Sequence, residues 1–239
     1  MLECFWTDLG RVGYVAALDL QRKIVVERQR GGIPDTLLLL EHPHVITLGR
    51  NGRPENLLAG GEHLRRAAIG FYPTDRGGDI TYHGPGQLVG YPILDLRQWR
   101  RDVVAYLRAL EQVLIDALGE FAIAAGRSGG LTGVWTGGAK IAALGVHIGR
   151  WVTSHGFALN VSTDLSYFQY IVPCGLSGKP VTSMERLLCR APAREQVMAA
   201  VVRQFGRAFG REMVEKKPSA ISHQPSASPY AEGVLTAES

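Results

Sequence analysis

KIAALGVHIGRWVTSHGFALNV, residues 140–161, is the stretch that indicates how this chain folds. Two β-like runs, 140–148 and 151–161, are separated only by Gly149 and Arg150. A two-residue connection with glycine at its first position favours a type II′ turn, whose twist matches that of paired strands. The stretch therefore predicts a β-hairpin.

The predicted register brings small residues together across the two strands. It places Ile148 opposite Trp151 and, counting back, Ala143 opposite Gly156. The small residues of the two runs are Ala143, Gly145, Gly156 and Ala158. A sheet surface with so little side-chain volume leaves room beside it, which either a slim apolar ligand or a closely packed helix can fill.

Helices and short strands alternate on both sides of this hairpin. Apolar residues recur every three or four positions over 14–30, over 103–121 after a candidate N-cap at Asp102, and over 194 to about 213. Further strand-like runs are 36–41, 44–48, 71–74, 79–83 and 87–94. This order predicts an α/β (α+β) fold, with a mixed β-sheet flanked by helices.

Composition sets the domain organisation but does not separate an enzyme from a binding module. Hydrophobic residues make up 46% and charged residues 20% of the 239 residues, as in ordinary soluble domains. We expect a single domain over residues 1–215. Residues 216–239 are rich in Ser, Pro and Ala and are predicted to form a disordered tail.

Charge and cysteine content point to a cytoplasmic protein with no membrane or nucleic-acid partner. No apolar run approaches the roughly 18 residues that span a bilayer, and the N-terminus lacks a signal-peptide pattern. The cysteines Cys4, Cys174 and Cys189 have no C-x-x-C spacing and fit free thiols in a reducing compartment. The net charge of +4 is scattered, which fits either a solvated surface or weak attraction toward an acidic protein partner.

Residues 75–92, DRGGDITYHGPGQLVGYP, form a candidate binding loop. Glycines allow a backbone to approach a ligand closely, and the polar residues are too many for a simple connection. The alternative is an irregular hairpin that exposes polar side chains. The chain has no phosphate-binding glycine motif, and its seven histidines have no metal-ligand spacing, so we expect no nucleotide, cofactor or metal.

Cys174 lies between Pro173 and Gly175 in IVPCGLS, residues 171–177. A thiol is nucleophilic as its thiolate, and a free pKa of roughly 8.5 leaves few per cent ionised at neutral pH, so a reactive cysteine needs a cation beside it. Lys140 is the candidate, because a partly desolvated ammonium stabilises a thiolate. The alternatives are an inert core thiol and a lysine that extends to solvent.

Three stretches together resemble the lipoate-protein ligase B family, the octanoyl-ACP:protein N-octanoyltransferases. They are RGGDITYHGPGQLVGYP (76–92), GGAKIAALGVHIGRWVTSHGFALNV (137–161) and VPCG (172–175). The similarity extends from residue 41 to about residue 188, and the first motif is highly specific. The resemblance implies the fold of the biotin/lipoate protein ligase catalytic domain.

The resemblance also implies an acyltransferase that works without cofactor or ATP. Cys174 would carry the octanoyl group as a thioester, and Lys140 would lower the pKa of that cysteine. The implied acyl-substrate contacts are Arg76, Gly77, Gly78, Asp79, Ile80, Thr81, Tyr82, His83, Ala143, Leu144, Gly145, Gly156, Phe157 and Ala158. The implied donor is octanoyl-acyl-carrier-protein, and the acceptors are a lysine of the lipoyl domains of 2-oxoacid dehydrogenase complexes and of the glycine cleavage H protein.

Two other functions fit parts of the pattern. An ATP-dependent lipoate or biotin-type protein ligase would activate a free acid as an adenylate, and a non-catalytic acyl-binding module would need only an apolar slot. Neither needs Cys174 paired with Lys140, so a functional pair argues against both. Candidate oxyanion donors are backbone amides near residues 140–141 or 174–175.

Overall fold

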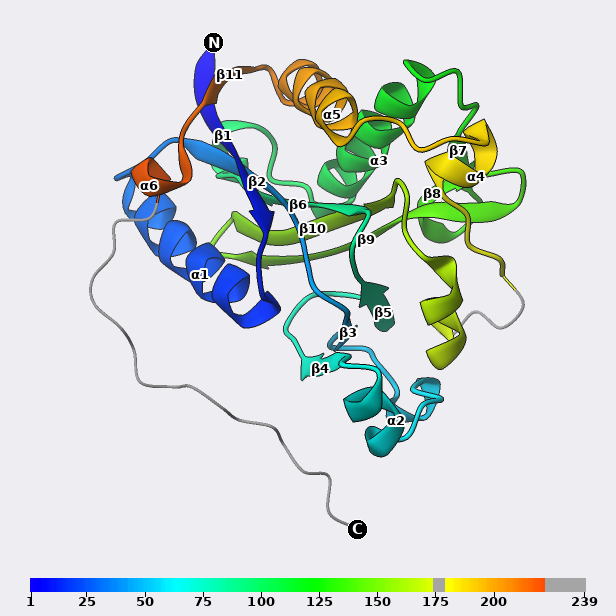
Figure 1. Cartoon of the computed structure of the whole chain (residues 1–239). Coiled ribbons are helices and arrows are strands. Elements are labelled where there is room, and N and C mark those ends of the chain that lie inside the picture. Colours follow the sequence, from blue (N-terminus) through cyan, green and yellow to red (C-terminus); the bar gives the residue numbers. More distant parts are fainter. Residues whose placement is uncertain (174–178, 222–239) are drawn as a thin grey trace.

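The computed structural model of the chain describes residues 1–173 and 179–221 (Figure 1), so the predicted nucleophile Cys174 and residues 222–239 of the predicted tail lie outside the described residues. The elements are β1 (Leu2–Arg11), α1 (Tyr14–Arg30), β2 (Asp35–Glu41), β3 (Val45–Leu48), η1 (Pro54–Asn56), α2 (Gly61–Arg66), β4 (Gly70–Pro73), β5 (Ile80–His83), β6 (Gln87–Ile93), η2 (Leu96–Gln98), α3 (Val103–Gly119), β7 (Gly126–Ser128), β8 (Leu131–Thr136), β9 (Ala139–Gly149), β10 (Val152–Asn160), η3 (Leu165–Tyr170), α4 (Met184–Leu188), α5 (Arg194–Phe209), β11 (Arg211–Glu215) and α6 (Pro218–Ile221).

A mixed sheet forms the centre of the molecule, as predicted. Its eight strands have the order β11-β1-β2-β6-β10-β9-β8-β7, and a three-stranded sheet has the order β4-β3-β5. β1 runs parallel to both β11 and β2, whereas the pairs from β2 through β6, β10, β9 and β8 to β7 are antiparallel. The small sheet lies below the large one in Figure 1.

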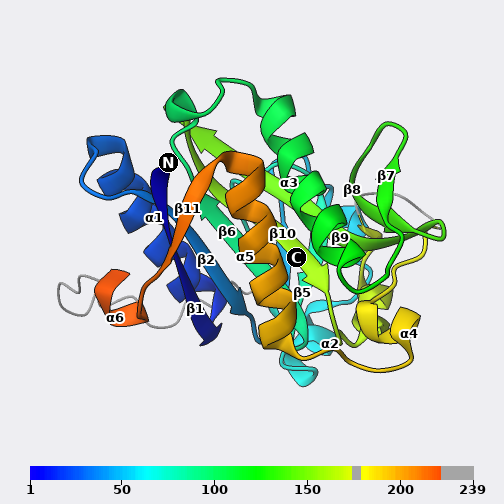
Figure 2. The ribbon, with the colours of Figure 1, turned by 90° about the horizontal axis from the view of Figure 1, so that it is seen from above.

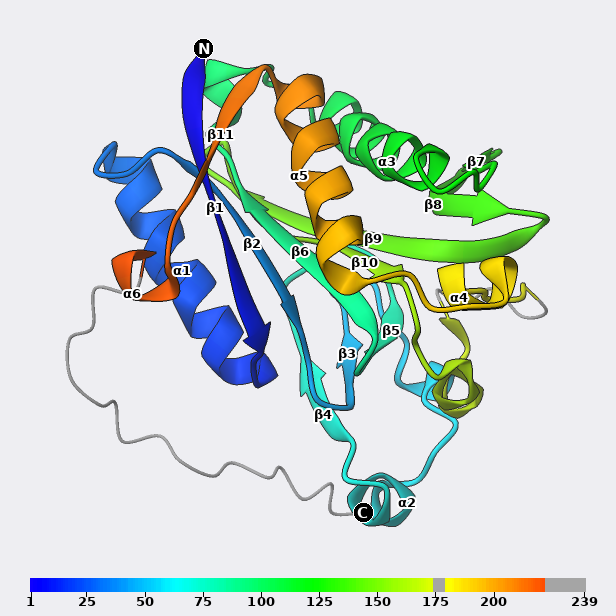
Figure 3. The same ribbon diagram turned by 45° about the horizontal axis from the view of Figure 1, so that its top comes forward.

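Helices cover both faces of the large sheet. α3 and α5 lie over one face and α1 over the other (Figures 2 and 3). The leucine run of β2 shows the cause, since Leu37 and Leu39 pack in the core beneath α3 and α5 while Leu38 and Leu40 pack toward α1. Successive side chains of a strand point to opposite faces, so an unbroken apolar run is typical of a strand buried on both sides.

The periodic patterns predicted two helices correctly and placed the end of a third wrongly. α1 ends at the left-handed Gly31, and the Asp102 carboxylate caps α3 by accepting a hydrogen bond from the Ala105 N–H. α5 ends at residue 209, not near 213, because the left-handed Gly210 (φ 61°) stops the helix and the chain continues as β11. Within the described residues, no helix has the length and apolar character needed to cross a bilayer.

The hairpin forms, but its turn lies one residue further along the chain than predicted. Gly149 pairs with Val152, so the connecting residues are Arg150 and Trp151, with φ of 52° and 67°. Two positive φ values are the pattern of a type I′ turn, so the type II′ prediction is wrong, as are the pairings of Ile148 with Trp151 and of Ala143 with Gly156. The shift leaves the small residues opposed, because Gly145 pairs with Gly156 and Ala143 with Ala158.

We expect Arg150→Asn to stabilise the fold. Arg150 is exposed and has φ of 52°, a conformation that is unfavourable for most side chains and that asparagine tolerates better. The unfolding free energy should rise by about 1 kcal/mol and the Tm by ~2–4 °C. Calorimetry on the full chain measures both. Arg150→Ala is the control that should change neither, and equal behaviour of the two variants would contradict the turn assignment.

Candidate functional site

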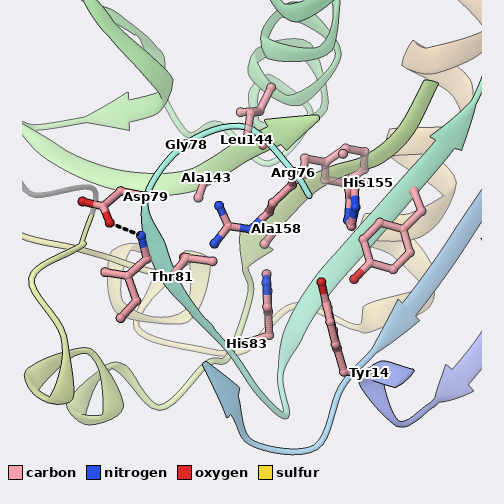
Figure 4. Close-up of a pocket in the computed structure, with 15 residues that line it drawn as sticks. Tyr14, Arg76, Gly78, Asp79, Thr81, His83, Ala143, Leu144, His155 and Ala158 are labelled. Carbon is pink, nitrogen blue, oxygen red and sulfur yellow. Dashed lines mark hydrogen bonds between the residues drawn. The ribbon is translucent and has the colours of Figure 1, made fainter. Parts of the chain in front are cut away.

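A narrow slot lies between the loop before β5 and the small-residue stretch of β9 and β10 (Figure 4). It has a cavity volume of about 50 Å³. Its walls are formed by Tyr14, Arg76, Gly78, Asp79, Ile80, Thr81, His83, Tyr91, Ala143, Leu144, Gly145, His155, Gly156, Phe157 and Ala158. The fold thus brings together all of the predicted substrate contacts except Gly77 and Tyr82, which do not line the slot.

The floor of the slot follows from the strand register. The pairs Gly145–Gly156 and Ala143–Ala158 lie two residues apart along each strand, so all four share one face of the hairpin. A Cβ on Gly145 would lie 2.8 Å from the carbonyl oxygen of Gly77. The missing side chain therefore lets the loop cross the strand at backbone contact distance.

Backbone hydrogen bonds hold the loop from both sides. On the side of the large sheet, the Gly77 N–H donates to the Val146 carbonyl at 2.8 Å. On the other side, the segment after β3 donates three bonds: from Gly49 to Asp79 at 3.1 Å, from Arg50 to Arg76 at 2.9 Å and from Asn51 to Gly78 at 3.2 Å. The segment 49–51 was not among the predicted site residues. The two glycines of LGRNG, residues 48–52, are the sequence feature that could have indicated a loop in close backbone contact at this place.

Arg76 is a buried cation in the wall of the slot, with 7% of its surface exposed. Its Nη2 donates to the Thr47 carbonyl at 2.7 Å and to the Thr47 hydroxyl at 2.9 Å. A Cβ on Gly49 would lie 2.8 Å from Nη1 and 2.4 Å from the Gly78 carbonyl oxygen. Gly49 and Gly145 therefore create the space in which the loop and this guanidinium lie.

His83 is a neutral histidine at physiological pH, and it begins a buried chain of polar groups. Burial lowers its pKa to about 3. Its Nδ1 donates to Gln87 Oε1 at 2.8 Å, Gln87 Nε2 donates to Asn160 Oδ1 at 2.9 Å, and Asn160 Nδ2 donates to the Thr182 carbonyl at 3.0 Å. Because Gln87 uses its N–H groups elsewhere, the proton of the ring lies on Nδ1 and the lone pair on Nε2. The chain of bonds ties β5 to the segment that follows residue 178.

Tyr82 points away from the slot into the core of the small sheet. Its hydroxyl donates to His44 Nδ1 at 2.8 Å, and its ring stacks on Tyr167 with 5.1 Å between centroids. Burial raises the pKa of its hydroxyl. These contacts show that Tyr82 packs in the core of the small sheet beneath the loop and does not face the cavity.

Aromatic and histidine side chains that were not predicted form the far wall of the slot. The Tyr91 hydroxyl donates to His42 Nε2 at 2.7 Å, and His42 Nδ1 donates to the Val12 carbonyl at 2.7 Å. Burial lowers the pKa of His42 to about 4. His155 lies 2.8 Å from Asp75, and this hydrogen bond is the main reason why the pKa of Asp75 lies below its usual range. Tyr91 and His155 lie within the stretches 76–92 and 137–161 that carry the resemblance, but they are not among the contacts that it implied.

Lys140 lies at the start of β9, with 8% of its surface exposed. Its backbone N–H donates to the Pro180 carbonyl at 2.9 Å, and its carbonyl accepts from the Thr182 N–H at 3.0 Å. The Lys140 amide is therefore occupied and does not serve as the oxyanion donor considered from the sequence. The predicted partner, Cys174, lies outside the described residues.

A wider hollow of about 510 Å³ adjoins the slot. Its walls are Asn51, Arg53, Asn56, Gly78, Asp79, Gly130, Leu131, Thr132, Lys140 and Leu144. Gly78, Asp79 and Leu144 line both cavities, so the narrow slot lies next to the hollow that Lys140 lines. In the stretches 1–173 and 179–221, no three histidine, cysteine or acidic side chains gather in a way that could hold a metal ion.

Acid should weaken the fold through the buried histidines of this region. Unfolded histidine titrates near pH ~6.5, whereas His42 and His83 titrate at about 4 and about 3 in the folded chain. Below about pH 6.5 the unfolded chain therefore binds more protons than the folded chain, and the unfolding free energy falls as the pH falls, by up to ~1.4 kcal/mol per pH unit for each histidine. Urea unfolding between about pH 7 and about pH 5 measures this slope.

In the variant His42→Gln the difference in bound protons between the unfolded and the folded chain should be smaller by about one, so the unfolding free energy should depend less steeply on pH. The control is His63→Gln, which replaces an exposed histidine in the same way. If His42→Gln and the parent chain have the same slope, the buried neutral state of His42 is wrong.

The amino-acid sequence matches the family described as "Lipoyl protein ligase A/B catalytic domain" over residues 13–206. An octanoyltransferase of Solibacter usitatus (strain Ellin6076) is 64% identical to the chain over 214 residues, which cover 90% of this chain and 96% of that protein. An octanoyltransferase of Koribacter versatilis (strain Ellin345) is 53% identical, covering 87% of this chain and 84% of that protein.

The fold is also similar to a solved structure, the crystal structure of lipoate-protein ligase A bound with ATP. The TM-score is 0.75 with 16% sequence identity, and the similarity covers 90% of this chain and 89% of that chain. At this identity the similarity bears on the fold alone, and it confirms the fold that the resemblance implied. The family match and the two relatives confirm the resemblance itself: the chain belongs to the lipoyl protein ligase A/B catalytic domain family and is an enzyme, an acyltransferase.

Proposed function

We propose that this enzyme transfers an octanoyl group from octanoyl-acyl-carrier-protein to a lysine of lipoyl domains, through a thioester on Cys174. The observation that carries the proposal is the position of Lys140, which lines the hollow next to the apolar slot. The slot would take the distal part of the acyl chain, and the hollow would take the rest of the chain and the reacting carbonyl group.

Octanoyl transfer in protein lipoylation is supported by the relatives, two of which are named octanoyltransferase at 64% and 53% identity over most of the chain. The finer statements are part of the proposal. They are the carrier-protein donor, the lipoyl domains of 2-oxoacid dehydrogenase complexes and of the glycine cleavage H protein as acceptors, and the cytoplasm as the location.

The slot suits a thin unbranched chain. Its floor consists of glycine and alanine pairs, and the segments of Leu144 and Phe157 between them also border it. Burying about seven chain carbons at ~0.8 kcal/mol each would contribute on the order of 5 kcal/mol to recognition. A binding contribution of this size can select a donor by its chain length, because each added or lost methylene changes affinity a few-fold.

The described residues on either side of Cys174 support its pairing with Lys140. Val172, two residues before Cys174, donates its N–H to the Asn56 carbonyl at 2.7 Å, and Asn56 lines the same hollow as Lys140. After the gap, Pro180 accepts a hydrogen bond from Lys140 itself at 2.9 Å. The chain therefore enters and leaves this segment beside the hollow.

The proposed reaction balances without ATP or another co-reactant. The Cys174 thiolate attacks the acyl carbon of the donor thioester, the donor C–S bond breaks, and the departing thiolate takes a proton from the Lys140 ammonium. The neutral Lys140 then takes a proton from the acceptor amine as the amine nitrogen attacks the enzyme thioester. The C–S bond to Cys174 breaks as the amide forms, which restores the thiolate and ammonium pair.

An ATP-dependent ligase is the main rival, because the enzyme shares its fold with a lipoate-protein ligase. A ligase would need a site for the nucleotide, and no phosphate-binding glycine motif is present in the sequence. The two mechanisms differ in whether the enzyme itself becomes acylated, so a test of acylation separates them.

Incubation with octanoyl-acyl-carrier-protein in the absence of ATP should increase the mass of the enzyme by one octanoyl group. Neutral hydroxylamine should remove the added mass, because it cleaves thioesters. Intact-protein mass spectrometry measures both steps. An unchanged mass, or transfer that requires ATP, would support the ligase or the non-catalytic acyl-binding module.

Cys174→Ala should reduce octanoyl transfer on the order of 10⁴-fold or more, because it removes the nucleophile. Lys140→Ala should slow formation of the acyl-enzyme by roughly 10²- to 10⁴-fold, because it removes the cation and the base. The control is Cys189→Ala, since this exposed thiol should have no role in transfer. Full activity of either dyad variant would refute the role assigned to that residue.

Ala143→Leu should shorten the chain that the slot accepts. Ala143 lies on the floor of the slot, so a larger side chain would fill the space of the distal carbons. Excluding about four carbons should lower kcat/KM for octanoyl donors on the order of 100-fold. Kinetics with butanoyl and octanoyl donors measure the preference, and Ala143→Ser is the control of similar size. An equal loss for both donors would show that the chain does not lie on Ala143.

A further inference from the structure

Trp135 on β8 lies directly opposite Lys140 on β9. The register pairs Val134 with Ala142 and Trp135 with Lys140, so β9 has one extra residue, Ile141, at this point. An inserted residue of this kind is a β-bulge, which bends a strand and changes the direction of a side chain. Directly opposed residues have their side chains on one face of the sheet, which brings the indole and the ammonium together.

The ammonium of Lys140 lies over the face of the Trp135 ring, with 4.9 Å from Nζ to the ring centroid. A cation within ~6 Å of an indole face is attracted by the negative potential of the ring, and Trp is the strongest of the aromatic partners. Trp135 is 6% exposed, and its indole N–H has no hydrogen-bond partner among the described residues. The ring therefore contributes its face to this contact.

Gly133 provides the space for the aliphatic part of Lys140. A Cβ on Gly133 would lie 3.2 Å from Lys140 Cε and 2.9 Å from the Ala142 carbonyl oxygen, and Gly133 has φ of 130°. Any other residue would be strained in this conformation and would press on the lysine. The trough over Gly133 and the ring of Trp135 together fix the direction in which Lys140 extends.

A buried carboxylate holds this part of β8 in place. Glu111 on α3 is fully buried and accepts a hydrogen bond from the Gly133 N–H at 3.0 Å. Its second oxygen accepts from Arg108 at 2.7 Å and from Arg127 at 2.9 Å. With both oxygens bonded, Glu111 anchors the backbone under Lys140 and is itself balanced by two guanidinium groups.

Other charged groups near Lys140 are themselves held by hydrogen bonds to the loop or to β8. From the other side of the hollow, Arg53 and Asp79 line the same cavity. The Asp79 carboxylate accepts hydrogen bonds from the backbone N–H groups of Arg53 and Ile80 and from the Asn56 side chain. The Asp79 carboxylate is thus held by the loop, and Glu111 is bonded beneath Gly133, while the Trp135 ring contacts the ammonium directly through its side chain.

The geometry points to Trp135 as a positioning residue of the acyltransferase, which holds the ammonium of Lys140 in place. The inference rests on the proposed function, in which that ammonium stabilises the Cys174 thiolate. Trp135 lines neither the slot nor the hollow, so it acts through Lys140 and not on the substrate.

The test is the pH dependence of Cys174 alkylation by iodoacetamide, followed by mass spectrometry of the Cys174 peptide in the full-length chain. The chain carries Cys189→Ala because Cys189 is exposed, whereas Cys4 is fully buried. In Trp135→Leu the midpoint of alkylation should rise by about 0.5 to 1 pH unit, which makes alkylation below the midpoint about 3- to 10-fold slower. Trp135→Phe should shift the midpoint in the same direction by less, because phenylalanine attracts cations more weakly.

The steady-state kinetics should show a matching split. Trp135→Leu should lower kcat for octanoyl transfer while KM for the donor changes little, because the ring does not touch the acyl chain. The control is Trp99→Leu. Trp99 also packs against the core, but it lies outside the site, so its loss should leave the alkylation midpoint unchanged. If Trp135→Leu fails to fold, Trp135→Phe alone decides.

Lys140→Ala separates failure of the inference from failure of the proposed function. If Lys140→Ala raises the midpoint and neither Trp135 variant does, the role of Trp135 is wrong and the dyad stands. If Lys140→Ala also leaves the midpoint unchanged, Lys140 does not activate Cys174, and both the dyad and the role of Trp135 are overturned.

Discussion

The absence of side chains where β9 and β10 face each other is the constraint on which the site depends. Gly145 opposes Gly156 and Ala143 opposes Ala158, so this part of the sheet has almost no side-chain volume. The carbonyl oxygen of Gly77 lies 2.8 Å from the place that a Cβ of residue 145 would take, and the loop is held there by the hydrogen bond from the Gly77 N–H to the Val146 carbonyl. A loop held so closely over a flat strand encloses a slot that is thin by construction, and a thin apolar slot is selective for a thin chain.

A second constraint is that the floor of the slot and Lys140, the proposed catalytic cation, lie on the same strand, β9. Ala143 and Gly145 form the floor of the slot, and Lys140 stands a few residues earlier on the same strand, with its backbone bonded to Pro180 and Thr182. One rigid strand therefore sets the distance between the acyl-chain floor and the ammonium. Groups that are positioned by regular structure lose little freedom when the substrate binds, which favours reaction over mere binding.

Local physical rules explain which elements were predictable. The helix caps at Asp102 and Gly31 follow from the few residues around each helix end, and the sequence contains all of that information. The hairpin turn was misplaced because Arg150 and Trp151 adopt left-handed conformations that neither residue prefers, so strand pairing overrides the local preference. β1 was missed because its two buried residues, Cys4 and Thr7, are three positions apart and show no alternation.

The amino-acid order alone specified the unbroken leucine run of β2, the RGGDITYHGPGQ motif, the lysine after a glycine pair and the small residues of the hairpin, because each is a local pattern with a direct physical meaning. Only the folded chain decided that Tyr14, Tyr91 and His155 close the far end of the slot, with His42 bonded to Tyr91, and that Trp135 lies against Lys140. These contacts join residues from separate strands and helices, and their distances depend on strand order, register and a single bulge. No short stretch of sequence contains those quantities, since each arises from the packing of the whole sheet.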